Sequence, residues 1–233
     1  MNLKFISDIF SDLINLIYPD VCIVCEDKLV KNERLFCTLC LADIPRTNFH
    51  LYVDNPVSRI FWGRCKIESA TSFFYFKKGS KYRSLLHKLK YKGRNDIGIE
   101  LGKMFGNDLI NSLYNNIDVI IPVPLHPAKL KIRGYNQSEQ IANGIGKRMN
   151  VPVINNALKR VVNTNTQTKQ ARFDRWLNVE DIFKYNISSN LLNKNILLVD
   201  DIITTGSTVE ACVNAIHKEI ECKIFAVSLA FTS

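Results

Sequence analysis

The feature that most constrains this chain lies at residues 196–208, where an apolar run meets two adjacent carboxylates. Asp200 and Asp201 follow four apolar residues; two more apolar residues, a hydroxyl-rich turn around Gly206 and a helical pattern from Val209 come next. Continuous apolar runs are typical of strands that are covered on both faces. Ligands of open α/β sheets collect at the carboxyl ends of such strands. The pattern therefore predicts a buried strand with an acidic end, a phosphate-sized loop and a helix start.

The turn at 204–208 has the composition of a phosphate-binding loop. Gly206 allows a close backbone approach, and the positive end of the following helix adds to the attraction for an anion. The hydroxyls around this glycine come from Thr204, Thr205, Ser207 and Thr208. Asp200 and Asp201 are acceptors for vicinal hydroxyls, so the stretch fits a ribose 5-phosphate. The alternative is a simple capped helix, because Ser207 and Glu210 have the spacing of a capping box.

This stretch resembles the signature of type I phosphoribosyltransferases, which bind phosphoribosyl pyrophosphate (PRPP). The resemblance implies that Asp200 and Asp201 bind the ribose hydroxyls and that residues 204–208 surround the 5-phosphate. It indicates a class of ligand and not a reaction, because several regulators keep this loop without catalysing transfer.

The remaining pattern predicts an α/β fold. With 233 residues, 46% of them hydrophobic, the chain can bury one full core and carry a small appendage. We expect strands over 69–76, 119–123, 151–154, 196–199 and 223–231, and helices over 82–91, 96–114, 137–148 and 209–219. Asn136 and Glu139 mark the start of the helix at 137–148. Strands that alternate with helices favour a mostly parallel sheet with helices on both faces, and residues 45–63 resemble a loop-like link.

Two cysteine pairs near the N-terminus predict a structural zinc site. The spacing is Cys-x2-Cys-x11-Cys-x2-Cys, formed by Cys22, Cys25, Cys37 and Cys40. Two such turns can close a tetrahedron of thiolates around Zn²⁺, which leaves no open position for catalysis. The alternatives are two disulfides, which the absence of an export signal disfavours, and an iron–sulfur cluster, whose commoner spacings differ.

The net charge of +9 favours polyanionic partners, and the excess is concentrated at residues 77–94. That segment carries no acidic residue, and aromatic residues are interleaved with its basic ones. This composition can follow a phosphate backbone and stack bases. The residues that we expect to contact nucleic acid are Lys88, Lys90, Lys92 and Arg94. The alternative is a solvated helix face beside a pocket that attracts a charged small molecule.

A proline-rich loop follows the expected strand at 119–123. Its sequence at 121–127, Ile-Pro-Val-Pro-Leu-His-Pro, is a stiff turn at the carboxyl end of a strand. The corresponding turn of type I phosphoribosyltransferases binds pyrophosphate through backbone amides. By that resemblance the ligand lies against Val123, Pro124, Leu125 and His126, and every one except the proline can donate an amide. Arg133 supplies a cation nearby. The alternative is a purely structural turn.

A third loop, at 164–178, is long and polar. Its composition predicts a lid that closes over the ligand, with Arg172 and Arg175 available to bind phosphate oxygens. The alternative is a solvated surface loop.

Together these features resemble the ComF family, which consists of phosphoribosyltransferase-like proteins linked to bacterial competence. The resemblance runs from Cys22 to about Ala230. It rests on the paired Cys-x-x-Cys, Leu-Lys-Tyr-Lys-Gly (89–93), Pro-Val-Pro-Leu-His (122–126), Arg-Gly-Tyr-Asn-Gln (133–137), Gln-Thr (167–168) with Arg172, Arg175 and Asn178, and the acidic phosphate loop. It implies a type I phosphoribosyltransferase fold with an N-terminal zinc knuckle, and a role in the uptake of single-stranded DNA beside a competence helicase.

Three functions remain open at this point. The leading hypothesis is a PRPP-binding protein that contacts single-stranded DNA during natural transformation. The second is an active phosphoribosyltransferase, in which Mg²⁺ neutralises the pyrophosphate, and Asp200, Asp201, Arg172 and Arg175 do the catalytic work. The third is a PRPP-sensing regulator, which is disfavoured because no helix-turn-helix segment is recognisable.

The N-terminal residues set the expected domain organisation and location. Residues 1–18 have an amphipathic helical stripe, residues 19–63 form the knuckle and link, and residues 64–233 form the phosphoribosyltransferase-like domain. No window approaches the roughly 18 apolar residues that a membrane span needs, and no signal peptide is recognisable. We therefore expect a cytoplasmic protein without a membrane span.

Overall fold

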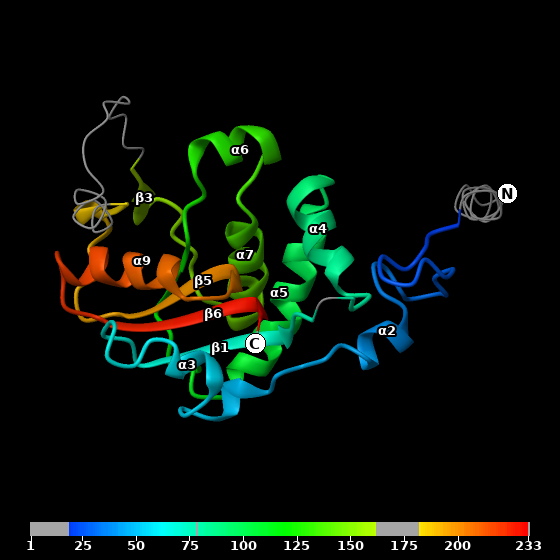
Figure 1. The fold of residues 1–233 in the computed structure, drawn as a ribbon, viewed down its shortest axis with the longest axis horizontal. Coiled ribbons are helices and arrows are strands. Elements are labelled where there is room, and N and C mark those ends of the chain that lie inside the picture. The colour runs from blue at the N-terminus through cyan, green and yellow to red at the C-terminus, as the bar shows by residue number, and fades with distance from the viewer. Residues whose placement is uncertain (1–18, 78, 162–181, 233) are drawn as a thin grey trace, which may run out of the picture.

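The structure, a computed structural model, describes residues 19–77, 79–161 and 182–232. Its centre is a four-stranded sheet in the order β1-β6-β5-β2, and every pair in it is parallel (Figure 1). The strands are β1 (Ser69–Tyr75), β2 (Val119–Pro122), β5 (Asn195–Ile203) and β6 (Lys223–Phe231). They are almost entirely buried, which explains their continuous apolar runs. The expected strand near 151–154 is reduced to a single parallel bridge between Val153 and Ile120.

Helices cover one face of the sheet and form the larger core with it. They are α4 (Arg83–Tyr91), α5 (Asn95–Ile110) and α7 (Gln137–Met149). Leu89, Phe105 and Ile145 from these helices pack with Leu197 and Val199 of β5, and all five are fully buried. The predicted helices over 82–91, 96–114 and 137–148 are thus present, with the second ending four residues earlier than expected.

The opposite face is covered by α9 (Ser207–His217), α3 (Pro56–Arg59) and a hairpin of β3 (Leu158–Arg160) with β4 (Phe183–Tyr185). Val57 and Phe61 are fully buried in this second core. The segment 45–63, expected as a loop-like link, is largely irregular, but it contains η1 (Phe49–Leu51) and α3, and its packing into this core was not predicted. Its few apolar residues are packed against the sheet although they show no regular period. The antiparallel hairpin was not predicted either, because each of its strands has only three residues.

Glycines allow α5 and α7 to pack almost backbone to backbone. A Cβ on Gly102 would collide with the carbonyl oxygen of Ile141, and one on Gly144 would collide with that of Ile99. This contact fixes the position of α7, whose first turn reaches the carboxyl end of β5. Asn136 caps that turn by accepting a hydrogen bond from the Ser138 amide, as the sequence predicts.

The N-terminal segment 19–44, which carries α2 (Thr38–Ala42), is attached to α4 (Figure 1). The Tyr82 hydroxyl donates to the Cys40 carbonyl over 2.7 Å, and Lys88 Nζ donates to the Ile23 carbonyl over 2.8 Å. Beyond it, Arg46 forms an antiparallel bridge with Phe74 and so covers the free edge of β1. The expected helix at 1–18 lies outside the described residues. No helix among the described residues is long and apolar enough to cross a bilayer.

Candidate functional site: an acidic strand end, a hydroxyl-rich loop and a cysteine cluster

Asp200 and Asp201 lie at the carboxyl end of β5 and face different partners. Ser138 donates its hydroxyl to Asp200 Oδ1 over 3.1 Å, and the Asp201 amide donates to the same oxygen over 2.8 Å. Asp201 forms an ion pair with Lys90, with 2.9 Å between Nζ and Oδ2. The pair therefore joins β5 to the first turn of α7 and the last turn of α4.

Burial raises the pKa of the Asp200 carboxyl to about 7, and the adjacent Asp201 charge adds to the shift. The Asp201 amide, the Ser138 hydroxyl and the Lys90 ammonium oppose it and hold the pKa lower than burial alone would. A carboxyl poised near neutrality can exist in either protonation state under ordinary conditions. Asp200 is therefore able to accept a hydrogen bond from a sugar hydroxyl or, when protonated, to donate one.

The loop after β5 exposes hydroxyls around a tightly packed glycine. Thr204, Thr205, Ser207 and Thr208 are exposed, whereas Gly206 is buried with φ +75°. A Cβ on Gly206 would lie 2.7 Å from Ile60 Cγ2 and 2.8 Å from Phe61 Cε1. Asp200 and residues 202–209 line a small hollow of about 30 Å³ here, beside the exposed hydroxyls. The expected loop is thus placed at the carboxyl edge of the sheet and directly before α9.

Arg64 stabilises this loop by binding its backbone and the first turn of α9. No sequence motif singled it out. Its Nη1 donates to the Thr205 carbonyl over 2.7 Å and to the Ile60 carbonyl over 3.1 Å, and its Nη2 pairs with Glu210. Because Glu210 is engaged there and the helix cap is Gly206 without a side-chain bond, the alternative of a Ser207–Glu210 capping box is not formed. Sequence patterns could not reveal Arg64, because it is about 140 residues away from its loop partners.

The proline-rich loop lies beside the acidic pair at the end of β2. The Val123 amide donates to the Val199 carbonyl over 2.9 Å, so it extends the sheet and is not free for a ligand. Of the expected donors only Leu125 and His126 remain. The His126 imidazole caps α6 (Pro127–Arg133) through a 3.1 Å bond from the Ala128 amide. Pro124, Leu125 and His126 are all partly exposed.

Arg133 lies at the end of α6 and faces the end of α4. Its guanidinium carbon is 5.3 Å from the centre of the Tyr91 ring, and Nη1 donates to Gln137 Oε1 over 2.6 Å. Lys90 precedes Tyr91 in α4, so Arg133 of α6 lies against the helix turn that carries the partner of Asp201. The loop at 164–178, with Arg172 and Arg175, lies outside the described residues, and its role as a lid stays a prediction.

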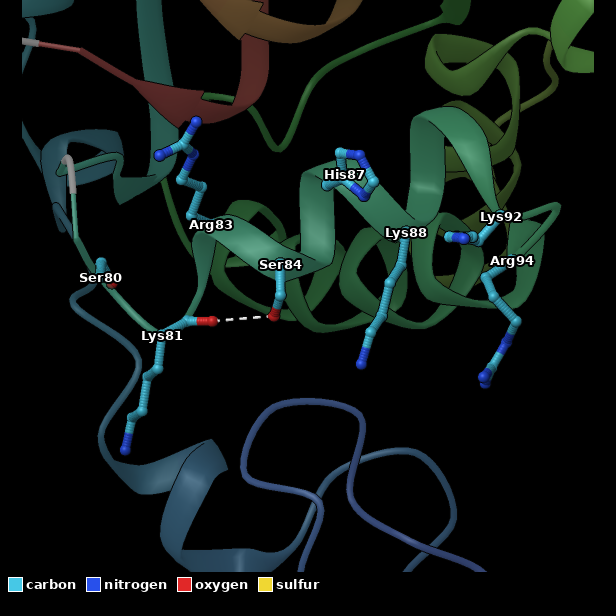
Figure 2. Close-up of a pocket in the computed structure, with 8 residues that line it drawn as sticks. All are labelled: Ser80, Lys81, Arg83, Ser84, His87, Lys88, Lys92 and Arg94. Atoms are coloured by element: carbon cyan, nitrogen blue, oxygen red, sulfur yellow. Dashed lines mark hydrogen bonds between the residues drawn. The ribbon is translucent and has the colours of Figure 1, made fainter.

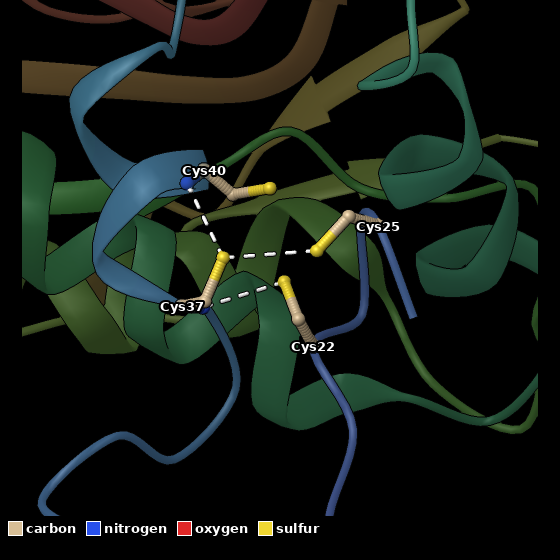
Figure 3. A group of neighbouring side chains, drawn as sticks. All are labelled: Cys22, Cys25, Cys37 and Cys40. Carbon is tan, nitrogen blue, oxygen red and sulfur yellow. Dashed lines mark hydrogen bonds between the residues drawn. The ribbon is translucent and has the colours of Figure 1, made fainter. Parts of the chain in front are cut away.

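The cysteines come together as the spacing predicts. The sulfur atoms of Cys22, Cys25, Cys37 and Cys40 all lie within 4.8 Å of one another (Figure 3). The Cys25 and Cys37 sulfurs are 3.7 Å apart, close to the ~3.8 Å that tetrahedral Zn–S bonds of about 2.3 Å require. Backbone amides of Cys37 and Cys40 donate to Cys22 and Cys37 Sγ over 3.3 and 3.4 Å, which favours thiolates. The cluster fits a structural zinc ion.

A basic groove follows the outer side of α4, next to the cysteine segment. It has a volume of about 770 Å³ and no acidic side chain among its lining residues, which are Ser80, Lys81, Arg83, Ser84, His87, Lys88, Lys92 and Arg94. In Figure 2 Lys88 and Arg94 point toward the N-terminal segment, and Arg83 points to the other side. Lys88 is bonded to the Ile23 carbonyl and Arg94 pairs with Asp96 over 2.8 Å. Lys90 does not line the groove.

The fold is a parallel sheet flanked by helices, with an acidic strand end and a hydroxyl-rich loop, and it carries a compact N-terminal cysteine cluster. The predicted fold class is thereby confirmed. Solved structures similar to it include a glutamine PRPP amidotransferase from Bacillus subtilis, with TM-score 0.37 and 20% identity over 59% of this chain and 30% of that one. An adenine phosphoribosyltransferase from Leishmania tarentolae has TM-score 0.38 and 10% identity over 77% of this chain and 89% of that one.

Among proteins with assigned names, Competence protein F of Haemophilus influenzae is 36% identical over 102 residues, which are 43% of this chain and only 44% of that protein. Competence protein ComFC of Bacillus subtilis is 26% identical over 211 residues, 88% of this chain and 82% of that protein. DNA utilization protein YhgH of Escherichia coli K12 is 24% identical over 197 residues, 81% of this chain and 80% of that protein. No protein-family model matches the chain. These relatives, named as competence and DNA utilization proteins, agree with the resemblance to the ComF family that the sequence motifs predict.

Proposed function

We propose that this ComF-type protein binds PRPP at the acidic strand end and contacts single-stranded DNA through the basic groove along α4, as a cytoplasmic factor in DNA uptake. The observation that carries the first half is the assembly of Asp200, Asp201 and the hydroxyl-rich loop at one edge of a parallel sheet. In this proposal the loop binds the 5-phosphate and the two acids bind the ribose hydroxyls.

Several features support an anion at the loop. The exposed hydroxyls of residues 204–208 lie immediately before α9, an 11-residue helix whose N-terminal amides attract negative charge. Arg64 holds the Thr205 carbonyl on the outer side of the loop. Because the C=O and N–H of one peptide point in opposite directions, this contact directs the Gly206 amide away from Arg64, where a ligand could accept from it. Mg²⁺ would enter with the pyrophosphate, bound mainly by the ligand and water.

Titration calorimetry with ribose 5-phosphate and PRPP, with and without Mg²⁺, tests this half. We expect binding by the wild type and a loss of about 10-fold or more in Asp200→Asn/Asp201→Asn, because each acid loses one charge-assisted hydrogen bond to the sugar. Asp118→Asn is a matched control, since Asp118 is an acid at the opposite end of a neighbouring strand. An equal affinity in the double variant and the wild type would refute this assignment.

The groove along α4 supports the DNA half of the proposal. Five of its eight lining side chains are Lys or Arg, and among the described residues Arg83 and Lys92 have no acidic partner. Exposed Tyr91 lies in the same helix and offers a ring for stacking. A groove of this charge attracts a phosphate backbone by counterion release, so the affinity should fall steeply as salt increases.

Fluorescence anisotropy with labelled single-stranded DNA at several salt concentrations tests the DNA half. We expect Arg83→Ala/Lys92→Ala to weaken binding and to reduce the salt slope by about one to two units, because two phosphate contacts are lost. Lys147→Ala, which removes an exposed lysine from α7, is the control. If wild-type protein does not bind DNA at low salt, or if the control weakens binding as much as the groove variant, the DNA role is excluded.

The two acids with the cation Lys90 beside them are also what a phosphoribosyl transfer requires, since charge must be stabilised on both the ring and the leaving group. Arg133, against the neighbouring Tyr91, is a second cation on the same side. The release of pyrophosphate from PRPP in the presence of a panel of bases and amines decides between transfer and binding. Release with one acceptor would establish an enzyme, and no release with any of them would favour a binding protein.

A further inference from the structure

The basic residues of α4 fall into two groups that face different sites. Lys88 and Lys92 line the basic groove, whereas Lys90 does not, and its ammonium lies 2.9 Å from Asp201 Oδ2. Each residue of a helix turns by about 100°, so Lys90 is rotated by about 200° from both of its neighbouring lysines. The sequence pattern grouped the three lysines together, but the helix separates them.

The contact between Lys90 and Asp201 is protected and well supported. Only 21% of the Lys90 side chain and 14% of the Asp201 side chain are exposed. On one side of Lys90 the Leu89 carbonyl accepts a hydrogen bond from the Tyr135 hydroxyl, and on the other side the Tyr91 ring lies against Arg133. The last turn of α4 is thereby attached to the segment between α6 and α7, and the ammonium is fixed at the acidic strand end.

Lys90 and the phosphate loop approach the acid pair from opposite faces of the sheet. The loop packs through Gly206 against Ile60 and Phe61, which belong to the core on the α9 face. Lys90 comes from α4, whose buried residues Leu85 and Leu89 belong to the core on the other face. In a ribose ring C1 and C4 flank the C2–C3 bond at opposite ends. When the 2- and 3-hydroxyls are held by the acids, C4 and its 5-phosphate therefore lie on one side of the acids and C1 lies on the other. With the 5-phosphate at the loop, C1 therefore lies on the side of Lys90.

Charge balance gives this position a purpose. Two adjacent carboxylates repel a ligand that carries a phosphate at C5 and a second anion at C1, and this repulsion grows where water is excluded. A lysine within contact of one acid offsets that repulsion and offers its other N–H groups to the second anion. A ribose 5-phosphate without a charged group at C1 gains far less from it.

We propose that Lys90 is a residue of the sugar-phosphate site and not of the DNA surface, where it binds the anionic group on C1 of a ribose 5-phosphate and so selects the diphosphate ligand. This inference rests on the proposed binding of PRPP. It assigns to Lys90 the choice between two ligands that share the ribose and the 5-phosphate.

The test compares PRPP, ribose 5-phosphate and single-stranded DNA on Lys90→Met, Lys90→Arg and the control Lys92→Met. We expect Lys90→Met to lower the affinity for PRPP by about 10- to 100-fold, the range for a lost charge-assisted hydrogen bond. The affinity for ribose 5-phosphate should change by less than about 3-fold. Lys90→Arg should keep most of the preference for PRPP, and Lys90→Met should bind DNA as the wild type does. Lys92→Met should show the opposite pattern, with a lower affinity for DNA and unchanged affinities for both sugar phosphates.

The ratio of the two small-molecule affinities is measured on one preparation, so a partly unfolded variant does not distort it. An unchanged ratio in Lys90→Met, or a loss of DNA affinity equal to that of Lys92→Met, would overturn the assignment of Lys90. If Lys90→Met does not fold, a Lys90→Arg variant without preference for PRPP would overturn it as well. Wild-type protein that binds neither sugar phosphate would instead refute the proposed function, and this inference with it.

Discussion

Replacing Gly206 by alanine should destabilise the protein far more than a glycine-to-alanine replacement at an unconstrained position. Gly206 has φ +75°, a conformation that costs an L-residue about 1–2 kcal/mol. In addition, the new Cβ would lie 2.7 Å from Ile60 Cγ2 and 2.8 Å from Phe61 Cε1, and Phe61 is fully buried. Inserting a methyl group into a filled core costs about 1–3 kcal/mol. The sum is a loss of about 2–5 kcal/mol in the free energy of unfolding.

Gly134→Ala is a matched control for this prediction. Gly134 has φ +79°, but no atom lies within 4 Å of the position of its missing Cβ, so only the backbone cost applies. We expect urea-induced unfolding, followed by circular dichroism in the presence of zinc and a reducing agent, to place Gly206→Ala about 1–3 kcal/mol below Gly134→Ala. At a slope of about 3 kcal/mol per M, this difference lowers the midpoint by about 0.3–1 M.

Gly206→Ala should also lower the affinity for ribose 5-phosphate, because relief of the collision moves the loop away from Ile60 and Phe61. Equal midpoints for Gly206→Ala and Gly134→Ala would refute the argument that α3 and its following turn hold the loop in place.

Three further predictions concern separate parts of the molecule. Removal of zinc by a chelator should release segment 19–44, whose bonds to Tyr82 and Lys88 then lose their partner, and limited proteolysis should detect cleavage there that added zinc prevents. Burial raises the pKa of Asp200 from 3.8 to about 7, so the folded state binds this proton more tightly than the unfolded state, and the free energy of unfolding should fall as the pH rises through this window. The Asp200→Asn variant has no such proton to lose, so urea titrations of this variant and the wild type should give a difference in unfolding free energy that shifts in favour of the variant as the pH rises from about 4 to about 8. A difference that is the same at every pH would contradict the burial of a charged group. Arg64→Met should lower the affinity for ribose 5-phosphate by about 10-fold in calorimetry, because the Thr205 carbonyl loses its donor. An unchanged affinity would show that the loop keeps its conformation without Arg64.

The sheet and most of its helices could be predicted because their signals are local. The strand before Asp200 is an uninterrupted apolar run, and Asn136 caps α7 as its sequence indicates. The cysteine cluster was equally accessible, since two short turns fix its spacing. In each case the residues that decide the structure lie within a few positions of one another.

The features that the sequence did not reveal depend on contacts between distant residues. Lys90 carries the same charge and lies in the same run as Lys88 and Lys92, and only the packing of α4 turns it toward Asp201. The Val123 amide was expected to be free, but the pairing of β2 with β5 uses it. The segment 45–63 has no regular apolar period, yet Val57 and Phe61 fill the second core because the sheet leaves that space open to them.

The central claim is that a ribose phosphate binds where β5 ends and the hydroxyl-rich loop begins. A crystal structure of the zinc-loaded protein soaked with ribose 5-phosphate tests it most directly. The account predicts the phosphate among the residues 204–208 and the 2- and 3-hydroxyls within hydrogen-bond distance of Asp200 and Asp201. Electron density for the sugar phosphate at another place, or a loop that stays closed to it at saturating ligand, would contradict the account.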